Sequence, residues 1–170
     1  MLLPLTAEYS LRATIHIAAR QRAVPGAWVR VGEIAAAVDV PRNYLSKTLH
    51  QLVRAGVLVS TRGPTGGFRL AVPAERLTLA RVAGVFAEPP NQRCLLGTGP
   101  CGANPRCPVH AGWKPVASRI AAFFSWTTIG DVIGSIGADD HVAAGPERAR
   151  GDLPSSPSPT RRLTRQESTP

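Results

Sequence analysis

The chain has 170 residues and a formal net charge of +9 at pH 7. This length suits one globular domain, or a small domain with an appended arm and tail. No stretch approaches the roughly 18 consecutive apolar residues of a membrane span, and the first residues lack the basic start and long apolar core of a secretion signal. The composition therefore predicts a cytoplasmic protein without a membrane segment.

The positive charge is distributed unevenly. Residues 137–170 carry five arginines against five acidic side chains, so the excess belongs to residues 1–136. No acidic residue lies between Asp39 and Glu75, where the basic residues are Arg42, Lys47, Arg54, Arg62 and Arg69. Such a segment can face a polyanion without local repulsion. Because solvated basic faces are also common, charge alone leaves a nucleic-acid surface and a plain surface equally open.

Three helices are predicted in the first third of the chain. Apolar residues at helical spacing predict one helix over residues 6–20, with Thr6 as its N-cap. A second, over Val31–Val38, ends at a turn in which Pro41 prevents simple continuation. The third opens at that proline and runs to Ala55, with its leucines on one side and its polar residues on the other.

A β-hairpin is predicted after the third helix. Two β-branched or apolar runs, Val57–Arg62 and Phe68–Ala71, are joined by the glycine-rich segment 63–67, which is typical of a hairpin tip. A hairpin that follows two such helices has the place of a wing. Thr78 is then the predicted N-cap of a further short helix, which ends before Pro89.

A long helix is predicted in the last part of the apolar sequence. From Val109 to Phe124, apolar residues recur at the spacing of one helix face. Pro115 interrupts this pattern and leaves two alternatives. Either the helix kinks at the proline, or it begins near Lys114 and leaves His110 in the preceding loop.

Thr128 is the predicted N-cap of a last short helix that ends around Ile136. The sequence beyond it is rich in Pro, Ser, Gly and Arg without apolar periodicity, which predicts a disordered tail. The predicted fold class is mainly α with a small β-hairpin wing, a winged helix-turn-helix joined to a long dimerisation helix. We divide the chain into a winged helix-turn-helix DNA-binding domain (1–88), a cysteine-rich metal or cluster loop (89–108), the dimerisation helix with the short terminal helix (109–136) and the tail (137–170).

The order of these elements predicts a DNA-binding protein, because the second helix of a winged helix-turn-helix enters the major groove through its N-terminal residues. Arg42 suits guanine and Asn43 suits adenine, since each can make paired hydrogen bonds to that base. Ser46 and Lys47 suit phosphates, and Arg62 is placed to enter the narrow minor groove. The predicted DNA-binding residues are Arg42, Asn43, Tyr44, Ser46, Lys47, Arg62, Gly66 and Gly67. The competing interpretation of each is an ordinary surface residue.

Three cysteines, Cys94, Cys101 and Cys107, are separated by six and five residues, and two residues separate the last of them from His110. An odd number of cysteines in a cytosolic chain argues against a disulfide framework. Thiolates bind soft or borderline metals, so three in one glycine- and proline-rich loop indicate a metal centre. A zinc ion on three cysteines and one histidine is an alternative, as are three unligated thiols.

Four segments resemble the Rrf-type family of winged-helix transcriptional regulators. They are EYSLRA at 8–13, RNYLSK at 42–47, LVRAGVL at 52–58 and RGPTGGFRL at 62–70. The resemblance runs from about Leu5 to Ile136 and omits the tail. It implies a dimeric repressor that senses iron–sulfur or nitric-oxide signals, with an iron–sulfur cluster of two-iron or four-iron type on the three cysteines.

The resemblance implies two candidates for the fourth cluster ligand. In the IscR-like pattern of the family, His110 stands where a histidine is the ligand. In the NsrR-like pattern, Glu8 stands where an acidic ligand comes from the partner subunit, and the segments around Glu8 and Arg42 slightly favour this pattern. Without ligation, Glu8 is a favourable charge in the first turn of a helix.

The sequence therefore predicts a homodimeric, DNA-binding transcription repressor that reads a pseudo-palindromic operator and whose operator affinity is set by a cluster. The alternative is a zinc-bearing or metal-free winged-helix regulator that responds by thiol oxidation. A Cys/His enzyme with Cys94 or Cys107 as nucleophile is disfavoured, because no oriented set of Cys, His and Asp or Asn is evident and the wing would be unexplained. No membrane partner is expected.

Overall fold

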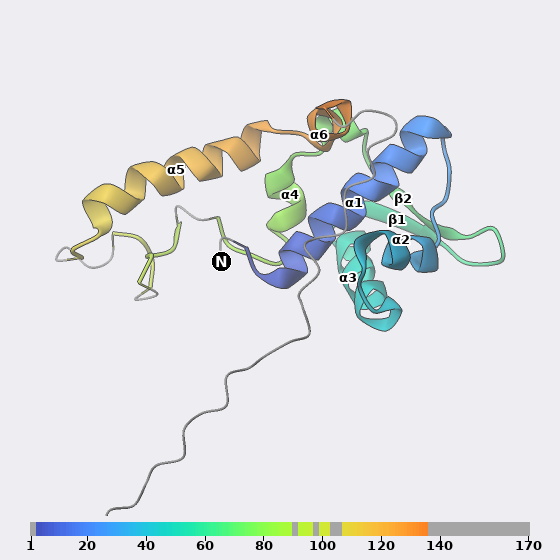
Figure 1. The fold of residues 1–170 in the computed structure, drawn as a ribbon, viewed down its shortest axis with the longest axis horizontal. Coiled ribbons are helices and arrows are strands. Elements are labelled where there is room, and N and C mark those ends of the chain that lie inside the picture. Colours follow the sequence, from blue (N-terminus) through green and yellow to red (C-terminus); the bar gives the residue numbers. More distant parts are fainter. Residues whose placement is uncertain (1–2, 90–91, 97–98, 103–106, 136–170) are drawn as a thin grey trace, which may run out of the picture.

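The computed structural model describes residues 3–89, 92–96, 99–102 and 107–135, which are mainly helical with a small antiparallel hairpin (Figure 1). The elements in chain order are α1 (Leu5–Ala23), α2 (Val31–Val38), α3 (Arg42–Arg54), β1 (Leu58–Thr61), β2 (Gly67–Leu70), the 3-10 helix η1 (Ala74–Arg76), α4 (Leu79–Ala83), α5 (His110–Trp126) and α6 (Ile129–Ser135). The predicted fold class is confirmed. Among the described residues, no helix is both long enough and apolar enough to cross a membrane.

Helix α1 is central to the folded unit, because α2, α3, α4, α6 and β2 all pack against it. Its buried face carries mainly small side chains, which lets several elements approach closely: Ala7, Ser10, Ala13, Thr14, Ile17 and Ala18. The two buried hydroxyls are satisfied within the helix. Ser10 donates to the Ala7 carbonyl and Thr14 donates to the Ser10 carbonyl, each at 2.7 Å.

The N-terminus of α1 differs from the prediction, which is wrong in taking Thr6 as the N-cap. Pro4 is the N-cap, and its carbonyl accepts hydrogen bonds from the N–H groups of Ala7 and Glu8 at 2.9 and 3.1 Å. Thr6 therefore lies inside the first turn. Its hydroxyl is hydrogen-bonded to the hydroxyl of Tyr44 on α3, so a tertiary contact uses the group that was expected to cap the helix.

Helices α2 and α3 form the helix-turn-helix. α2 has its predicted span, and α3 is one residue shorter at each end than predicted. Between them Asp39 adopts a left-handed conformation with φ 54°, and the Val40 N–H bonds back to the Ala35 carbonyl at 3.1 Å. This tight turn fixes the angle at which α3 leaves α2. The buried face of α3 is formed by Leu45, Thr48, Leu49 and Leu52.

The wing is the antiparallel pair β1 and β2, in which Leu58 lies opposite Leu70. Val29 extends this sheet on the outer edge of β2, because its N–H and carbonyl both bond to Phe68, at 2.9 and 2.8 Å. Phe68 is buried and anchors the wing in the core. β1 is one residue shorter at each end than the predicted run, whereas β2 has the predicted length but begins and ends one residue earlier, at Gly67 and Leu70.

Helix α4 is capped by Thr78, as predicted, through a hydrogen bond from the Arg81 N–H to the Thr78 hydroxyl at 3.2 Å. It is shorter than the helix predicted to reach as far as Pro89. Regular α-helical structure ends at Ala83, and the chain continues through tighter turns from Gly84 onward. α4 packs between α1 and α5.

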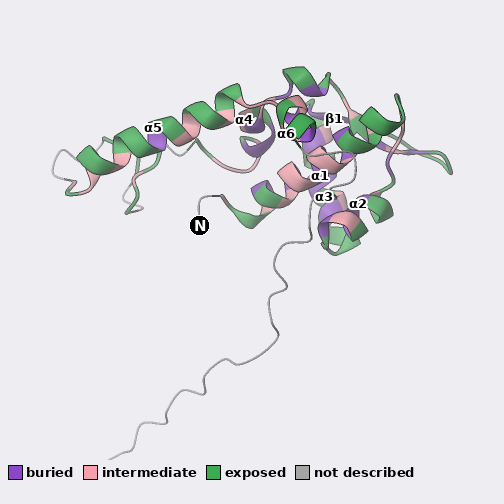
Figure 2. Ribbon diagram, turned by 45° about the horizontal axis from the view of Figure 1, so that its top comes forward, coloured by how far each residue is buried: buried purple, intermediate pink, exposed green. Residues whose placement is uncertain are grey.

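Helix α5 projects from the rest of the described chain, and its surface is mainly exposed (Figures 1 and 2). It begins at His110 and contains Pro115, so the alternative of a start near Lys114 with His110 left in the loop is wrong. The first turn forms ahead of the proline, because the Trp113 N–H bonds to the Val109 carbonyl at 2.8 Å. A proline near a helix start removes one backbone hydrogen bond but leaves this turn intact.

Helix α6 folds back onto α1 and η1, where Ile129 and Ile133 are buried. Its predicted cap, Thr128, is confirmed and reciprocal. The Thr128 N–H and hydroxyl donate to the Asp131 carboxylate at 2.9 and 2.8 Å, and the Thr128 hydroxyl accepts from the Asp131 N–H at 3.0 Å. The predicted helix end at Ile136 and the predicted tail over 137–170 lie outside the described residues.

Candidate nucleic-acid interface and metal centre

The exposed side of α3 presents the predicted DNA-binding residues. Arg42 and Asn43 form its first turn and Lys47 lies one turn further on, all three exposed, with Ser46 half-buried. Arg42, Asn43 and Lys47 make no side-chain hydrogen bond or ion pair with any other residue that the structure describes. Their polar groups are therefore available to a partner, which is the arrangement that groove and phosphate contacts require.

Tyr44 is predicted only as a DNA-binding residue, but in the structure it also packs against α1. Its hydroxyl is bonded to Thr6, and its ring lies edge-on to Tyr9 with the centroids 6.1 Å apart. Both partners belong to α1, so Tyr44 braces the recognition helix against the central helix. With 41% of its surface exposed, it also remains open to DNA.

The wing glycines are explained by close backbone approach. A Cβ on Gly66 would lie 2.4 Å from the Thr61 carbonyl oxygen, and one on Gly67 would lie 2.5 Å from the Val29 carbonyl oxygen. Side chains are thus excluded at both positions by packing, whatever the wing contacts. Arg62, the predicted minor-groove residue, follows β1 and is exposed.

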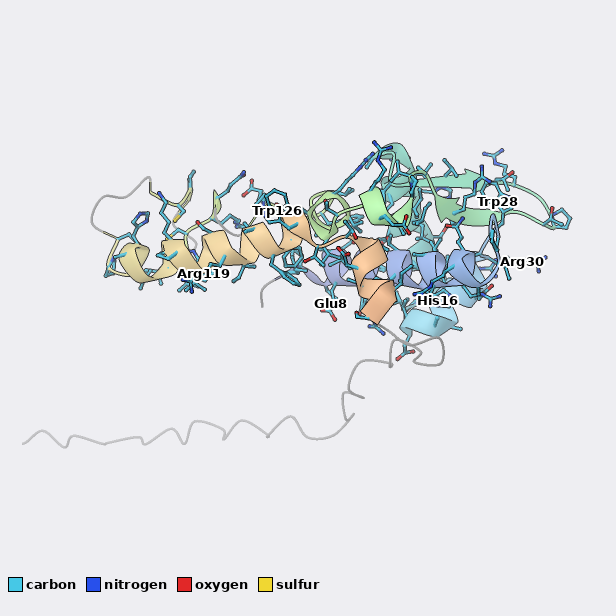
Figure 3. The ribbon with its side chains drawn as sticks, turned by 90° about the horizontal axis from the view of Figure 1, so that it is seen from above. Glu8, His16, Trp28, Arg30, Arg119 and Trp126 are labelled. Carbon is cyan, nitrogen blue, oxygen red and sulfur yellow. The ribbon has the colours of Figure 1, made fainter. Side chains whose placement is uncertain are left out.

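Sequence reasoning missed two contacts that position the wing. The Arg30 guanidinium donates a hydrogen bond to the Pro64 carbonyl at the wing tip. The Arg69 guanidinium lies 4.5 Å from the ring centroid of Trp28, within cation–π distance. Figure 3 shows Trp28 and Arg30 at the wing end of the molecule. No local pattern could reveal these contacts, because they depend on the pairing of Val29 with the wing.

The cysteine loop brings its candidate ligands together in two pairs. The Cys94 and Cys107 sulfurs are 3.8 Å apart, and the Cys101 sulfur is 3.6 Å from Nδ1 of His110. The loop backbone places them: the Cys94 N–H bonds to the Gly99 carbonyl, and the Cys101 N–H bonds to the carbonyl of Gln92, both at 3.0 Å. The predicted participants Cys94, Cys101, Cys107 and His110 thus occupy one region of the molecule.

The spacing within each pair suits two ligands on one tetrahedral metal. Bonds of about 2.3 Å to sulfur and about 2.0 Å to nitrogen at a tetrahedral angle place two sulfurs roughly 3.8 Å apart, and a sulfur and a nitrogen roughly 3.5 Å apart. Within the described ranges, no three or more His, Cys, Asp and Glu side chains gather closely enough to hold one ion. In this arrangement each pair could therefore supply two ligands to one metal atom, and the four groups do not converge on a single ion.

Glu8, the other predicted fourth ligand, lies in the first turn of α1 and is exposed. Figure 3 shows it well separated from the sulfur atoms near the start of α5. A single chain therefore does not bring Glu8 to its own cysteine loop. In the predicted route, Glu8 would reach the cysteine loop of a second copy.

A helix-turn-helix with a hairpin wing and an unpaired basic first turn on the second helix defines the class of winged-helix transcription regulators. The family model for Rrf2, described as an iron-dependent transcriptional regulator, matches residues 4–135, and the chain belongs to the Rrf2 family. The expected family is thereby confirmed. This family consists of regulators of transcription and not of enzymes, which agrees with the expectation that the chain is not an enzyme.

Individual proteins support the same assignment. A protein of Aquifex aeolicus that carries the name of an HTH-type transcriptional regulator is 35% identical over 131 residues, 75% of this chain and 88% of that protein. The regulator IscR of Vibrio campbellii is 28% identical over 126 residues, 74% of this chain and 73% of IscR. The solved structure of CymR, the global cysteine regulator of B. subtilis, is similar with a TM-score of 0.65 and 18% identity, covering 79% of this chain and 97% of CymR. The last comparison supports the fold.

Proposed function

We propose that this Rrf2-family regulator is a homodimeric repressor whose affinity for a pseudo-palindromic operator is set by an iron–sulfur cluster on Cys94, Cys101 and Cys107. The observation that carries the cluster is the arrangement of the candidate ligands in two pairs at metal-ligand spacing. The description of the family as iron-dependent supports it. When bound, the cluster supplies a redox-active and exchangeable centre in the loop.

His110 is the fourth ligand in this proposal, because its ring nitrogen lies beside the Cys101 sulfur. Cys94 with Cys107 would hold one iron, and Cys101 with His110 the other, which favours the two-iron type of cluster over the four-iron type. Imidazole is more readily exchanged than thiolate, which suits a centre that must respond to a signal such as an oxidant or nitric oxide. Glu8 of the partner subunit is the alternative ligand.

The DNA contacts follow the placement of the unpaired side chains. Arg42 and Asn43 would address base edges in the major groove, and Ser46 with Lys47 would bind phosphates. Arg62 would enter the minor groove from the wing, whose tip is held by Arg30. Gly66 and Gly67 keep the wing backbone close enough to its own sheet to present that arginine.

The dimer would form through α5. Three large apolar side chains on it are exposed to an extent unusual for a monomer: Val116 at 49%, Phe123 at 58% and Trp126 at 82%. A second copy of the helix would bury them and relate two recognition helices by a two-fold axis, which makes the operator pseudo-palindromic.

The cysteine loop is positioned to couple the cluster to this dimer helix. It leads directly into α5, and the Trp113 indole N–H donates to the Arg93 carbonyl in the loop at 3.1 Å. A change in the cluster can regulate only if it favours one dimer geometry over another. A shift of the first turn of α5 would alter the spacing of the two recognition helices.

Thiol oxidation is the second candidate mechanism, favoured by the 3.8 Å between the Cys94 and Cys107 sulfurs. In a metal-free protein a peroxide could oxidise this pair. One thiolate displaces water from the peroxide, and the second thiol then forms the disulfide. Overall the two thiols lose two electrons and two protons, and the peroxide is reduced to two waters.

Anaerobic purification of the full chain separates these mechanisms. The proposal predicts a coloured protein with two iron and two sulfide per subunit and the Mössbauer spectrum of a two-iron cluster. It also predicts that the His110→Ala variant loses its iron faster than the Glu8→Ala variant does. The reverse order of the two variants would establish Glu8. Stoichiometric zinc without iron or sulfide would refute the cluster, and a metal-free protein that forms a Cys94–Cys107 disulfide with peroxide would establish the second mechanism.

Regulation is measured on the same samples. Operator affinity should differ between the clustered and cluster-free dimers in anaerobic anisotropy titrations, by about 5-fold to 150-fold for typical coupling. Equal affinities in the two states would refute regulation by the cluster while leaving DNA binding intact.

A further inference from the structure

A cavity of about 700 Å³ lies between the end of α1, the segment that follows β2, η1 and α6. Its volume falls in the range of roughly 300–1,000 Å³ that small-molecule sites occupy. The residues that carry the argument are Gln21, Arg22, Leu70, Glu75, Ile133 and Gly134. None of them belongs to the proposed DNA surface or to the cysteine loop, so the proposed function leaves this cavity without a role.

Two opposite charges line the cavity without meeting. The Arg22 guanidinium donates one hydrogen bond, to the Ile133 backbone carbonyl at 2.7 Å, and has no carboxylate partner in the described chain. Glu75 makes no side-chain hydrogen bond or ion pair to the residues that the structure describes. The cavity therefore presents one cation and one anion whose charges are not neutralised by the protein.

Helix α6 contacts both charged residues. Gly130 packs on the backbone of Glu75, since a Cβ at Gly130 would lie 2.9 Å from the Glu75 Cα. Ile133, three residues further along α6, holds Arg22. Gly130 and Ile133 are about one helical turn apart, so the same stretch of α6 contacts both of the residues that bring charge to this cavity.

A neutral donor and aliphatic surface complete the lining. The side-chain oxygen of Gln21 accepts the Leu70 N–H at 3.0 Å, which leaves the amide NH₂ group of Gln21 without a described partner. Leu70, Val72 and Ile133 supply the aliphatic surface. Arg22 and Glu75 are both exposed at this site. A ligand with a carboxylate and an ammonium group could pair with both residues, whereas a simple carboxylate or a simple amine could pair with only one of them.

We propose that this cavity binds a small aliphatic α-amino acid. Its carboxylate would accept hydrogen bonds from Arg22 and Gln21, and its ammonium group would donate to Glu75. Its side chain would lie against Leu70 and Ile133.

The same cavity lies between the end of wing strand β2 and helix α6, which follows α5. Leu70 ends β2, and Gln21 holds its N–H, so a ligand on Gln21 acts on the base of the wing. This regulatory part rests on the proposed function, whereas ligand binding itself does not. Amino-acid binding is therefore measured without DNA first and with the operator second.

The test titrates the full chain separately with each of the twenty standard L-amino acids by calorimetry and by thermal shift. Two further probes resemble L-leucine: 4-methylpentanoate lacks its ammonium group, and 3-methylbutylamine lacks its carboxylate. We expect saturable binding of at least one aliphatic amino acid, with both of these analogues binding about tenfold more weakly than L-leucine or not at all.

Variants assign that binding to the cavity. Arg22→Met and Glu75→Gln should each weaken it by about tenfold or more, because each removes a charged hydrogen-bond partner. Gly134→Phe should abolish it by filling the space, since nothing lies within 4 Å of a Cβ placed there. Arg76→Gln, in the same turn as Glu75 but outside the lining, is the control and should bind as the unmodified chain does.

Absence of binding by all twenty amino acids would overturn the proposal, as would unchanged binding in Arg22→Met and Glu75→Gln. If Gly134→Phe does not fold, these two variants still decide the assignment. With the operator present, a bound amino acid that leaves DNA affinity unchanged would overturn the regulatory part alone. Failure of the unmodified chain to bind any operator would instead count against the proposed function.

Discussion

The arginines of this chain differ in whether their side chains interact with other described residues. Arg20 pairs with Glu33 at 2.7 Å, and Arg22 holds the Ile133 carbonyl, so both contribute to contacts within the folded unit. Arg42 and the neighbouring Lys47 have no such partner among the described residues. A charged group that the fold leaves exposed and unpaired is free to contact a partner, and the partner proposed for these two residues is DNA.

Arg42 and Lys47 should differ in what they recognise. Arg42→Ala should lose about 1 to 3 kcal/mol of binding free energy at the cognate operator and much less on random DNA, because a paired contact to guanine is lost. Lys47→Ala should lose nearly the same amount on both and reduce the slope of log affinity against log salt by about one unit. Anisotropy titrations at several salt concentrations measure both effects. Equal losses for both variants on every duplex would contradict the proposed docking.

Gly67 tests the packing of the wing at a single atom. The added methyl group of Gly67→Ala would lie 2.5 Å from the Val29 carbonyl oxygen, so the sheet edge must shift. The free energy of unfolding should fall by about 1 to 3 kcal/mol. Gly32→Ala is the matched control, because nothing lies within 4 Å of its Cβ, and it should be neutral or stabilising by up to about 1 kcal/mol. Urea denaturation measures both, and equal stability of the two variants would contradict this explanation.

Individual elements are held at their ends by short-range chemistry. The cap of α6 is reciprocal between Thr128 and Asp131, and the cap of α4 is a single bond to Thr78. The wing differs, because its tip is held by Arg30, which is far away in the sequence. Caps therefore act within one turn, while the wing depends on the whole helix-turn-helix being folded.

The α6 cap should make stability depend on pH. Hydrogen bonds from the Thr128 backbone and then from its side chain lower the pKa of Asp131 below its ordinary value of 3.8. A lowered folded-state pKa stabilises the fold above the unfolded-state value and loses that contribution as pH falls through the folded-state value. Asp131→Ala should therefore lower the melting temperature at pH 7, and the difference should shrink below roughly pH 4. A difference that stays constant from pH 7 to pH 3 would contradict this cause.

The wing tip should lose its position without Arg30. Arg30→Met should speed hydrogen exchange in the tip segment and weaken binding to operators with A·T-rich flanks, as Arg62→Ala should, because both variants affect the minor-groove contact. The variant Arg30→Lys, which keeps the charge but not the guanidinium geometry, should recover binding only in part. Full recovery by the lysine would show that charge, and not the position of the wing, accounts for the effect.

At the scale of the whole molecule, the described chain has one packed unit around α1 and a helix that leaves it. α5 buries Ala117 but exposes several large apolar side chains. Its ribbon in Figure 2 is mainly green, the colour of exposed residues. Exposed apolar surface of this kind is unfavourable in water, and the free energy of the protein falls when a second copy covers that surface. Helix α6 then returns to the unit, so the C-terminal end of α5 is tied to the packed part of the chain.

Dimerisation through α5 can be tested at Phe123. Phe123→Glu should shift the chain from dimer to monomer in analytical ultracentrifugation and weaken operator binding, because a charge replaces an apolar contact. Ser118→Glu introduces the same charge on an exposed position that helical spacing places on the other side of α5, and it should remain dimeric. A dimeric Phe123→Glu would place the interface elsewhere.

Local patterns in the sequence were enough to determine the span of α2, the span of α3 to within one residue at each end, the caps Thr78 and Thr128, and the order that defines a winged helix. Periodicity and capping act over a few residues, and a single chain segment displays them. Only the tertiary structure decided that Thr6 bonds to Tyr44 instead of capping α1, and that His110 lies in α5 beside Cys101. The wing contact of Arg30 and the cavity between α1 and α6 also emerged only there. These features join residues far apart in sequence, and their energies depend on distances that exist only after the chain has folded.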